Sequence, residues 1–184
     1  LAALGSWGHG CTLTGALQCE DTEVMVEGLR QLGYRIQVNW PTLRVLPNKH
    51  GLVPVDSAEI FVANSGTTMR FLTALCAAGK GRFRLDGVPR MQERPIEELL
   101  LALRECGVNA YSETGTGCPP VIIDSHGLTG QGTALISGGR SSQFVSALLM
   151  VAPYNERGPL NFSIKLDGRL VSKPYVRMTE AMMR

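Results

Sequence analysis

An internal repeat with a period of about 75 residues constrains the fold of this sequence more than any other feature. The Leu-Asp-Gly sequence at 85–87 recurs at 166–168 and resembles Leu-Thr-Gly at 13–15, while the helix-like ending at 103–107 resembles residues 29–33. The copies share one order of parts, which is a polar segment, an apolar helix, a strand, a loop and a second helix. Because the offsets between the copies agree, we predict an α/β fold of three βαβαββ units packed around a pseudo-threefold axis.

The predicted units cover residues 1–62, 63–137 and 138–184, and the first and third units are incomplete. Residues 1–5 resemble the last turn of a helix, and a helix needs more than one turn to form. We therefore expect one incomplete domain, with a second domain of the same protein absent. Hydrophobic periodicity and turn residues predict the individual elements. The predicted helices cover 22–32, 71–78, a segment ending at 107, 144–151 and a segment starting near 176, and the predicted strands cover 11–17, 34–38, 43–46, 60–63, 81–85, 109–112, 121–124 and 160–166.

Composition argues against several classes of protein. The formal net charge is only +2, which argues against a general nucleic-acid binder that works by neutralising phosphates. No apolar run approaches the roughly 18 residues that a membrane-spanning helix needs. The five cysteines form no Cys-x-x-Cys pair and lie near no histidine pattern. We therefore expect reduced thiols, a cytoplasmic location and no metal site.

A polar segment opens the first helix in the second and third copies of the repeat. Asn-Ser-Gly-Thr-Thr-Met-Arg occupies 64–70, and Arg-Ser-Ser-Gln occupies 140–143. The free N–H groups of a helix start attract anions, and glycine lets a ligand approach the backbone closely. Ordinary helix capping by Ser, Thr or Asn is the alternative explanation. Because two equivalent segments each carry an arginine, we favour a convergent anion site near the threefold axis.

A loop rich in arginine follows the strand of the second copy at residues 86–95. Flanking prolines restrict the backbone on both sides of Arg90, which suggests a positioned guanidinium group. Arginine is suited to bidentate recognition of carboxylate or phosphate. A solvated loop in which Glu93 pairs with an arginine is the alternative. The counterpart of this loop at 167–175 again places hydroxyl and basic side chains beside a proline.

Four stretches, at 64–70, 89–96, 141–144 and 171–175, resemble the enolpyruvyl transferase family and follow the family's order. They are most similar to the members that act on shikimate 3-phosphate. The resemblance implies two similar domains, each of three βαβαββ units, that close on the substrates. It also implies transfer of the enolpyruvyl group of phosphoenolpyruvate to the 5-hydroxyl of shikimate 3-phosphate, with release of phosphate. This reaction belongs to the shikimate pathway of aromatic amino-acid biosynthesis, and glyphosate is the known inhibitor.

The resemblance also assigns roles to individual side chains. The residues that would contact phosphoenolpyruvate are Asn64, Gly66, Arg90 and Gln143. The residues that would hold shikimate 3-phosphate are Ser141, Ser142, Gln143, Ser172 and Tyr175, with support from Thr67, Arg70, Arg94 and Lys173. The resemblance assigns no catalytic group within this chain. It implies no cofactor and no metal, and a monomeric enzyme when both domains are present.

The sequence departs from the family pattern at several places. The family's Lys-Ser-x-x-x-Arg segment, which holds both anions, would precede residue 1. The second domain, which carries the groups for proton transfer, would also be missing, so we expect this chain alone to be inactive. Phe71 stands where many members have proline or leucine, and Arg140 directly precedes the serine pair. Either departure would affect affinity for phosphoenolpyruvate or glyphosate, in a direction that the sequence leaves open.

Two other functions fit parts of this pattern. The sister enzyme that acts on UDP-N-acetylglucosamine typically carries a reactive cysteine in the loop equivalent to residues 88–95. Here that loop holds Arg90 and Met91 and no cysteine, which favours the shikimate reaction. A non-catalytic remnant or assembly domain is the second alternative, because the predicted domain is incomplete.

Overall fold

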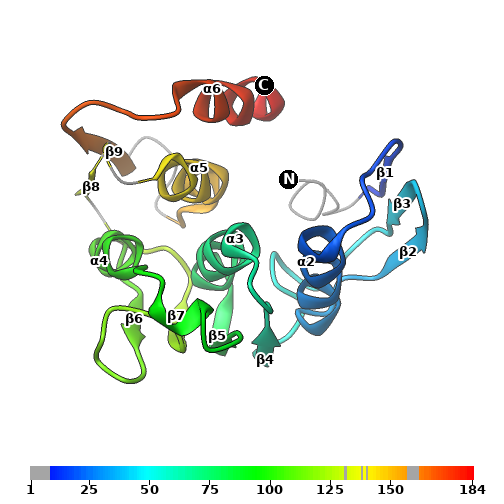
Figure 1. Ribbon diagram of the computed structural model, residues 1–184, viewed down its shortest axis with the longest axis horizontal. Helices are drawn as coiled ribbons and strands as arrows, with labels where there is room; N and C mark the ends of the chain where they lie inside the picture. The colour runs from blue at the N-terminus through cyan, green and yellow to red at the C-terminus, as the bar shows by residue number, and fades with distance from the viewer. Residues whose placement is uncertain (1–8, 131, 138, 140, 157–161) are drawn as a thin grey trace.

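The computed structural model describes residues 9–130, 132–137, 139, 141–156 and 162–184. The helix end predicted at 1–5, Arg140 and the start of the strand predicted at 160 lie outside the described residues. Figure 1 shows the sheets on the outside and the helices α3 (Gly66–Ala78) and α5 (Ser142–Val151) side by side in the centre. This arrangement confirms the predicted α/β fold.

The strands of the described residues form three separate sheets. The first sheet is antiparallel with the order β1-β3-β2, and the third pairs β8 with β9 in parallel. The second has the order β4-β5-β7-β6, in which β4 and β5 are parallel and the other pairs are antiparallel. The strands are Cys11–Leu13 (β1), Ile36–Asn39 (β2), Thr42–Val45 (β3), Ser57–Phe61 (β4), Lys80–Asp86 (β5), Asn109–Ser112 (β6), Val121–His126 (β7), Gly132–Ser137 (β8) and Phe162–Asp167 (β9).

In the described part of the chain, three further α-helices surround the central pair. They are Glu20–Gln31 (α2), Glu97–Glu105 (α4) and Lys173–Met183 (α6), and two short 3-10 helices cover Met91–Glu93 (η1) and Ala152–Tyr154 (η2). Helix α2 has acidic residues in its first turn and Arg30 in its last turn, an arrangement that the helix dipole favours. Within the described parts of the chain, no helix is long and apolar enough to cross a lipid bilayer.

Helix α3 is buried on nearly all sides. It contacts α2, α4, α5, β5 and β7, and most of its side chains are buried, as expected for a helix in a protein interior. Its approach to α2 depends on a glycine, because a Cβ on Gly28 would lie 2.5 Å from Leu72 Cδ1 and 3.1 Å from Ile60 Cγ2. Helix α2 therefore packs against α3 and β4 at a distance that only glycine permits without rearrangement.

From β4 onward, the elements follow one another in a βαβαββ order, as β4, α3, β5, α4, β6 and β7. The same kind of side-chain contact is found within the first copy and within the second copy. Arg30 Nη2 donates to the Ile36 carbonyl oxygen at 2.9 Å, and Arg104 Nη1 donates to the Ala110 carbonyl oxygen at 2.6 Å. In both copies an arginine near the end of the helix therefore holds the strand that follows.

Hydrogen bonds in the sheets group the chain differently from the predicted unit boundaries at 62 and 137. Strand β4 pairs with β5, and strand β8 pairs with β9. Strands β4 and β8 are therefore hydrogen-bonded to the copy that follows the one in which the sequence-based boundaries place them. The sequence predicts only a glycine-rich connection over 127–132 and no strand at β8. In the structure, buried Ala134 and Ile136 alternate with exposed Thr133 and Leu135, but Leu135 is apolar, so the sequence shows no apolar and polar alternation that would reveal this strand. The absence of a second domain stays a prediction.

We expect Leu103→Ala to lower the free energy of unfolding by about 2–5 kcal/mol, because truncation of a buried leucine leaves a cavity. Leu103 has no exposed surface on α4, whereas Leu101 of the same helix is 48% exposed. Leu101→Ala is therefore the matched control, with an expected change of less than about 0.5 kcal/mol. Urea denaturation measures both variants, and equal losses would contradict the packing of α4.

Candidate functional site

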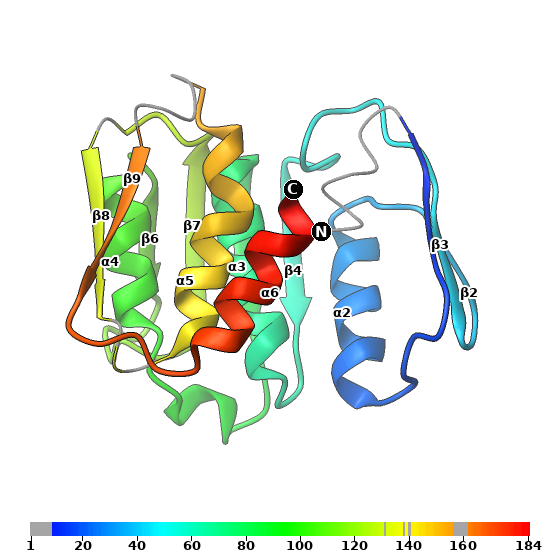
Figure 2. The ribbon, with the colours of Figure 1, turned by 90° about the horizontal axis from the view of Figure 1, so that it is seen from above.

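The candidate site lies where strand β4 ends and helix α3 begins. Ala63 has a positive φ of 47°, and its carbonyl oxygen accepts a hydrogen bond from the Val88 N–H at 3.1 Å. Ser65 caps the helix, since its Oγ accepts a hydrogen bond from the Thr68 N–H at 3.3 Å. Figure 2 shows the first turns of α3, α5 and α6 at the same lower side of the molecule. Three helix starts, each with partial positive charge, therefore face one side.

Gly66 is the first residue of α3, and two guanidinium groups lie against its Cα. A Cβ at this position would overlap Arg94 Nη2 and lie 2.7 Å from Arg70 Nη1. Arg94 follows η1 in the loop after β5, and its Nη1 donates to the Asn64 carbonyl oxygen at 3.0 Å. Arg70 belongs to α3, and its Nη1 donates to the Gly66 carbonyl oxygen at 3.4 Å. A side chain at this position would displace the two guanidinium groups from where they lie.

Gln143 connects the starts of α5 and α3. Its Oε1 accepts a hydrogen bond from Arg70 Nη1 at 2.5 Å, and its Nε2 donates to Thr67 Oγ1 at 3.0 Å. Ser141 caps α5 and accepts a hydrogen bond from the Gln143 N–H at 3.3 Å. The Arg70 guanidinium also lies over the Phe144 ring, 5.1 Å from its centroid. The two helix starts that the sequence singles out therefore meet in the structure.

Arg70, Arg94, Thr67 and Gln143 form what we call the arginine cluster. Both arginines are partly buried, and neither belongs to an ion pair within the described residues. Burial, and then the nearby positive charge of Arg94, lower the pKa of Arg70 below its ordinary value. A bound anion would therefore supply the negative charge that this cluster lacks.

A second partly buried arginine site shows the contrast. Arg84 Nη2 lies 3.1 Å from Asp86 Oδ2 and 2.8 Å from Glu113 Oε2, so two carboxylates balance its charge. These contacts raise the pKa of Arg84, first through the hydrogen bond to Glu113. Arg84 is thus a structural ion pair, and the unbalanced charge is confined to the arginine cluster among the partly buried arginines of the described chain.

Arg90 makes a different contact from the one that the family resemblance implies. Its Nη1 lies 2.5 Å from Glu93 Oε2, and its side chain is 74% exposed. Asp86 holds the start of the same loop, because its Oδ1 accepts hydrogen bonds from the Gly87 N–H at 2.7 Å and from Gln92 Nε2 at 3.0 Å. Asp86 has no role in the sequence-based prediction, although the recurrent Leu-Asp-Gly was a signal for it.

The start of α6 carries the last group of predicted residues. Ser172 precedes the helix with a left-handed φ of 53°, Lys173 is its first residue, and Tyr175 is 60% exposed. No hydrogen bond or ion pair in the described chain joins these three residues to the arginine cluster. Helix α6 is instead attached to α5 through Thr179 Oγ1, which donates to Ser146 Oγ at 2.9 Å.

The structure thus brings together part of the predicted site. The residues joined by hydrogen bonds or close contacts are Asn64, Gly66, Thr67, Arg70, Arg94, Ser141 and Gln143. Ser142 is buried in the first turn of α5. The exposed residues outside these contacts are Arg90, Ser172, Lys173 and Tyr175. Their ligand contacts stay predictions.

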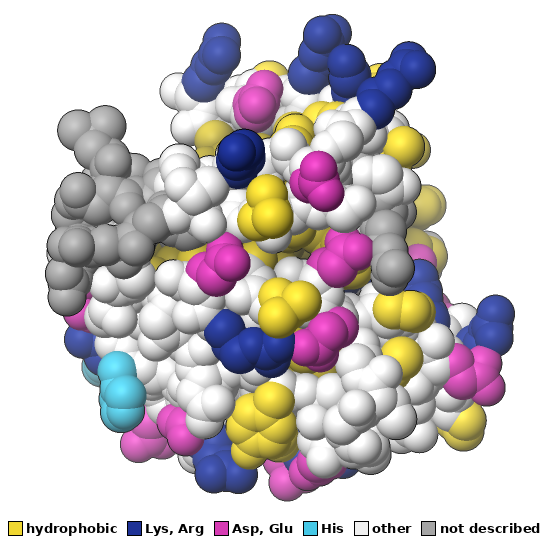
Figure 3. Space-filling model, turned by 90° about the vertical axis from the view of Figure 1, so that its left-hand side faces the viewer, with side chains coloured by type: hydrophobic (Ala, Val, Ile, Leu, Met, Phe, Trp, Pro, Cys, Tyr) yellow, Lys and Arg dark blue, Asp and Glu magenta, His cyan; other side chains and the backbone are white. Residues whose placement is uncertain are grey.

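Basic side chains also gather near α6. In Figure 3, Lys and Arg side chains lie along the upper edge of the face, in the region that α6 and β9 occupy in Figure 1. The charged residues from β9 to the end of the chain are Lys165, Asp167, Arg169, Lys173, Arg177, Glu180 and Arg184. This segment therefore carries an excess of positive charge beside the start of α6.

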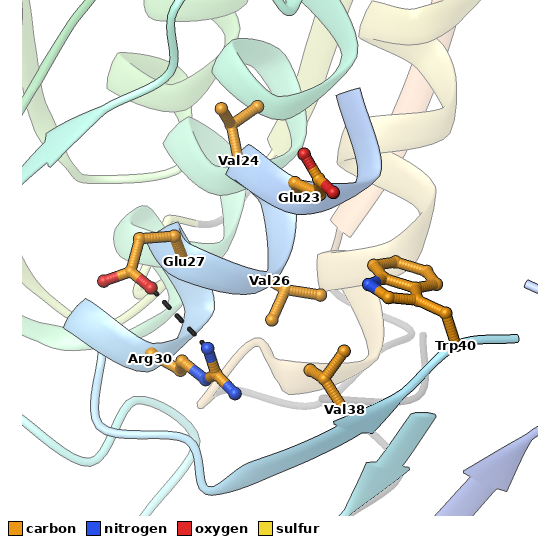
Figure 4. A pocket seen from close by; sticks show the side chains of 7 residues that line it. All are labelled: Glu23, Val24, Val26, Glu27, Arg30, Val38 and Trp40. Atoms are coloured by element: carbon orange, nitrogen blue, oxygen red, sulfur yellow. Dashed lines mark ion pairs between the residues drawn. The ribbon is translucent and has the colours of Figure 1, made fainter. Parts of the chain in front are cut away.

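Neither of two surface hollows includes a residue of the arginine cluster. A hollow of about 360 Å³ is lined by Glu23, Val24, Val26, Glu27, Arg30, Val38 and Trp40 (Figure 4). Its arginine pairs with Glu27 at 3.8 Å, so its charge is already balanced. A second hollow of about 470 Å³ contains Arg104, which pairs with Glu97 at 2.5 Å. Across the described ranges, no three His, Cys, Asp or Glu side chains are grouped as metal ligands.

Three helix starts on one side of an α/β domain (Figure 2), with two arginines that have no carboxylate partner in the described chain, are typical of an anion site. The family model described as EPSP synthase (3-phosphoshikimate 1-carboxyvinyltransferase) matches residues 1–184. The chain therefore belongs to the EPSP synthase family, within the enolpyruvyl transferases that its motifs resemble.

The sequence and the structure of the chain are also similar to those of known members of this family. The chain is 45% identical over 175 residues to a 3-phosphoshikimate 1-carboxyvinyltransferase of Shewanella baltica, covering 94% of this chain and 40% of the relative. A protein of the same name from Nostoc punctiforme is 40% identical over 172 residues, covering 93% and 39%. A solved EPSP synthase from Acinetobacter baumannii shares the fold, with a TM-score of 0.72 and 23% identity over 82% of this chain and 34% of that one. The chain thus spans about 40% of the length of the curated relatives it matches.

We expect Gly66→Ala to raise the dissociation constant for inorganic phosphate roughly tenfold or more, because the new methyl group displaces both arginines of the cluster. Isothermal titration calorimetry measures this change. Gly139→Ala is the control, since its Cβ would meet nothing closer than Ser137 Oγ at 3.7 Å. An unchanged dissociation constant for the Gly66 variant would show that phosphate binds elsewhere.

Proposed function

We propose that this chain forms part of an enzyme that transfers the enolpyruvyl group of phosphoenolpyruvate to the 5-hydroxyl of shikimate 3-phosphate. Membership of the EPSP synthase family supports this proposal. The observation that carries it is the arginine cluster, which joins two helix starts and has no carboxylate partner within the described residues. Both substrates carry phosphate and carboxylate groups, which are the anions that guanidinium groups and helix N-termini bind.

Phosphoenolpyruvate is proposed to bind at the arginine cluster. Gly66 lets the two guanidinium groups lie against the start of α3, and Gln143 and the arginines provide N–H donors. Asn64 belongs to the same turn. Arg90 would join this site after leaving Glu93, from a loop whose start Asp86 already holds. Donors fixed around the phosphate would stabilise the charge that develops as phosphate leaves.

Shikimate 3-phosphate is proposed to bind beside it, along the starts of α5 and α6. The residues proposed to contact it are Ser141, Ser142, Gln143, Ser172 and Tyr175, with Lys173 adding positive charge. Gln143 would then touch both ligands, because it belongs to the start of α5 and also bonds Thr67 of α3. A shared contact of this kind would hold the attacking hydroxyl close to the enolpyruvyl group.

The reaction itself requires groups of another kind. The 5-hydroxyl gives up its proton as its oxygen adds to C2 of phosphoenolpyruvate, and C3 gains a proton. The intermediate then loses phosphate from C2 as C3 gives up a proton, which restores the double bond. The arginine cluster contains guanidinium, amide and hydroxyl groups and no carboxylate or histidine for proton transfer. We therefore propose that the remainder of the longer relatives supplies these groups. A monomeric enzyme in the cytoplasm is part of the same proposal.

For the chain alone, we expect binding without turnover. Titration of phosphoenolpyruvate should move the backbone amide signals of Gly66, Thr67 and Gln143, and salt should weaken this binding. A phosphate-release assay with both substrates should show no turnover until the remaining part of the enzyme is added. Signals that move only around Trp40, in the hollow of Figure 4, would contradict the proposed site.

In the enzyme completed in this way, we expect Arg90→Lys to raise the Michaelis constant for phosphoenolpyruvate at least about tenfold, because lysine lacks the planar fork of donors. Glu93→Gln is the matched control, since it removes the partner of Arg90 and leaves the guanidinium group. It should leave the Michaelis constant unchanged or lower it. Steady-state kinetics that stay within twofold for Arg90→Lys would remove this residue from the site.

A further inference from the structure

We propose that Arg70 is a positioning residue that fixes the side-chain amide of Gln143, so that this amide presents only N–H donors to the bound anion. The identity of the anion, phosphoenolpyruvate, rests on the proposed function. The contact between Arg70 and Gln143 is a property of the free protein and does not depend on that identity.

The chemistry of the two side chains fixes the orientation of the amide. A guanidinium group has only hydrogen-bond donors, so Gln143 must turn its Oε1 toward Arg70. Its Nε2 then faces Thr67 and donates to Oγ1 at 3.0 Å. The second N–H of Gln143 and the hydroxyl proton of Thr67 remain for a ligand. An amide turned the other way would present its oxygen to the anion and repel it.

The location of Arg70 is unfavourable in electrostatic terms, which argues for a specific role. A positive charge near the start of a helix opposes the helix dipole, and Arg94 adds a second like charge beside it. The Nε atom is buried without a hydrogen-bond partner among the described residues. The ring of Phe144 and the oxygens of Gly66 and Gln143 hold the group in place.

The equivalent helix shows that packing alone does not require an arginine here. Counting from the capping serines Ser65 and Ser141, the position of Arg70 in α3 corresponds to Ser146 in α5. Ser146 is buried and accepts a hydrogen bond from Thr179 of α6 at 2.9 Å. The repeat therefore accepts a small residue at this position, and the arginine is specific to the copy that contacts Gln143.

The test compares two arginine variants of this chain by NMR and by titration with phosphoenolpyruvate. Arg70→Met keeps an unbranched stem over Phe144 and removes the donors, whereas Arg94→Met removes the neighbouring charge and leaves the contact with Gln143. In Arg70→Met, the side-chain amide signals of Gln143 should move to the positions of a freely rotating glutamine. The dissociation constant should rise roughly ten- to hundredfold. Arg94→Met should also weaken binding but leave these signals in place.

Gln143 signals that are unchanged in Arg70→Met, or that move equally in both variants, would overturn the proposal. If Arg70→Met does not fold, Thr67→Val gives the answer, because Arg70 still holds Oε1 in that variant. Side-chain amide signals of Gln143 that stay away from the positions of a freely rotating glutamine in Thr67→Val would support the proposal. Signals that move to those positions would overturn it. A chain that shows these differences without binding phosphoenolpyruvate would keep the positioning role and refute the proposed substrate.

Discussion

The burial of α3 at the centre of the molecule is the constraint on which the other elements depend. This helix contacts α2, α4 and α5 and two strands of the second sheet. The orientation of these elements therefore depends on how they pack against α3. Its buried hydroxyl groups are satisfied locally, as when Thr73 Oγ1 donates to the Met69 carbonyl oxygen at 2.7 Å. Because the core lies along its length, the polar chemistry is concentrated at its first turn, beside the start of α5.

The sequence predicts the order of elements and the two polar helix starts because these are local or repeated features. It cannot show that Thr67 and Arg70 meet Gln143, since that contact joins segments far apart in the chain and depends on the packing of α3 against α5. The pairing of Arg90 with Glu93 could be foreseen only as one of two alternatives. The strand β8 escaped prediction because its glycine-rich approach resembles a loop.

The partly buried arginines of the candidate site and of the surrounding structure differ in whether a carboxylate balances their charge. Arg84 has two carboxylate partners and helps to hold a strand end and a loop. Arg70 and Arg94 have none in the described chain, and like charges that are partly buried side by side lower stability. An anion bound here would relieve this repulsion, so under the proposed function binding would also stabilise the fold of this region.

The recurrent contacts of Arg30 and Arg104 remain within their own copies, whereas the contacts of Gln143 with Arg70 and Thr67 join the third copy to the second. Gene duplication would reproduce the first kind of contact without further change. The second kind joins equivalent positions that carry different residues, Thr67 and Gln143, which both lie two residues after a capping serine. A symmetrical ancestor could thus keep its architecture while its ligand chemistry evolved at the boundaries between copies.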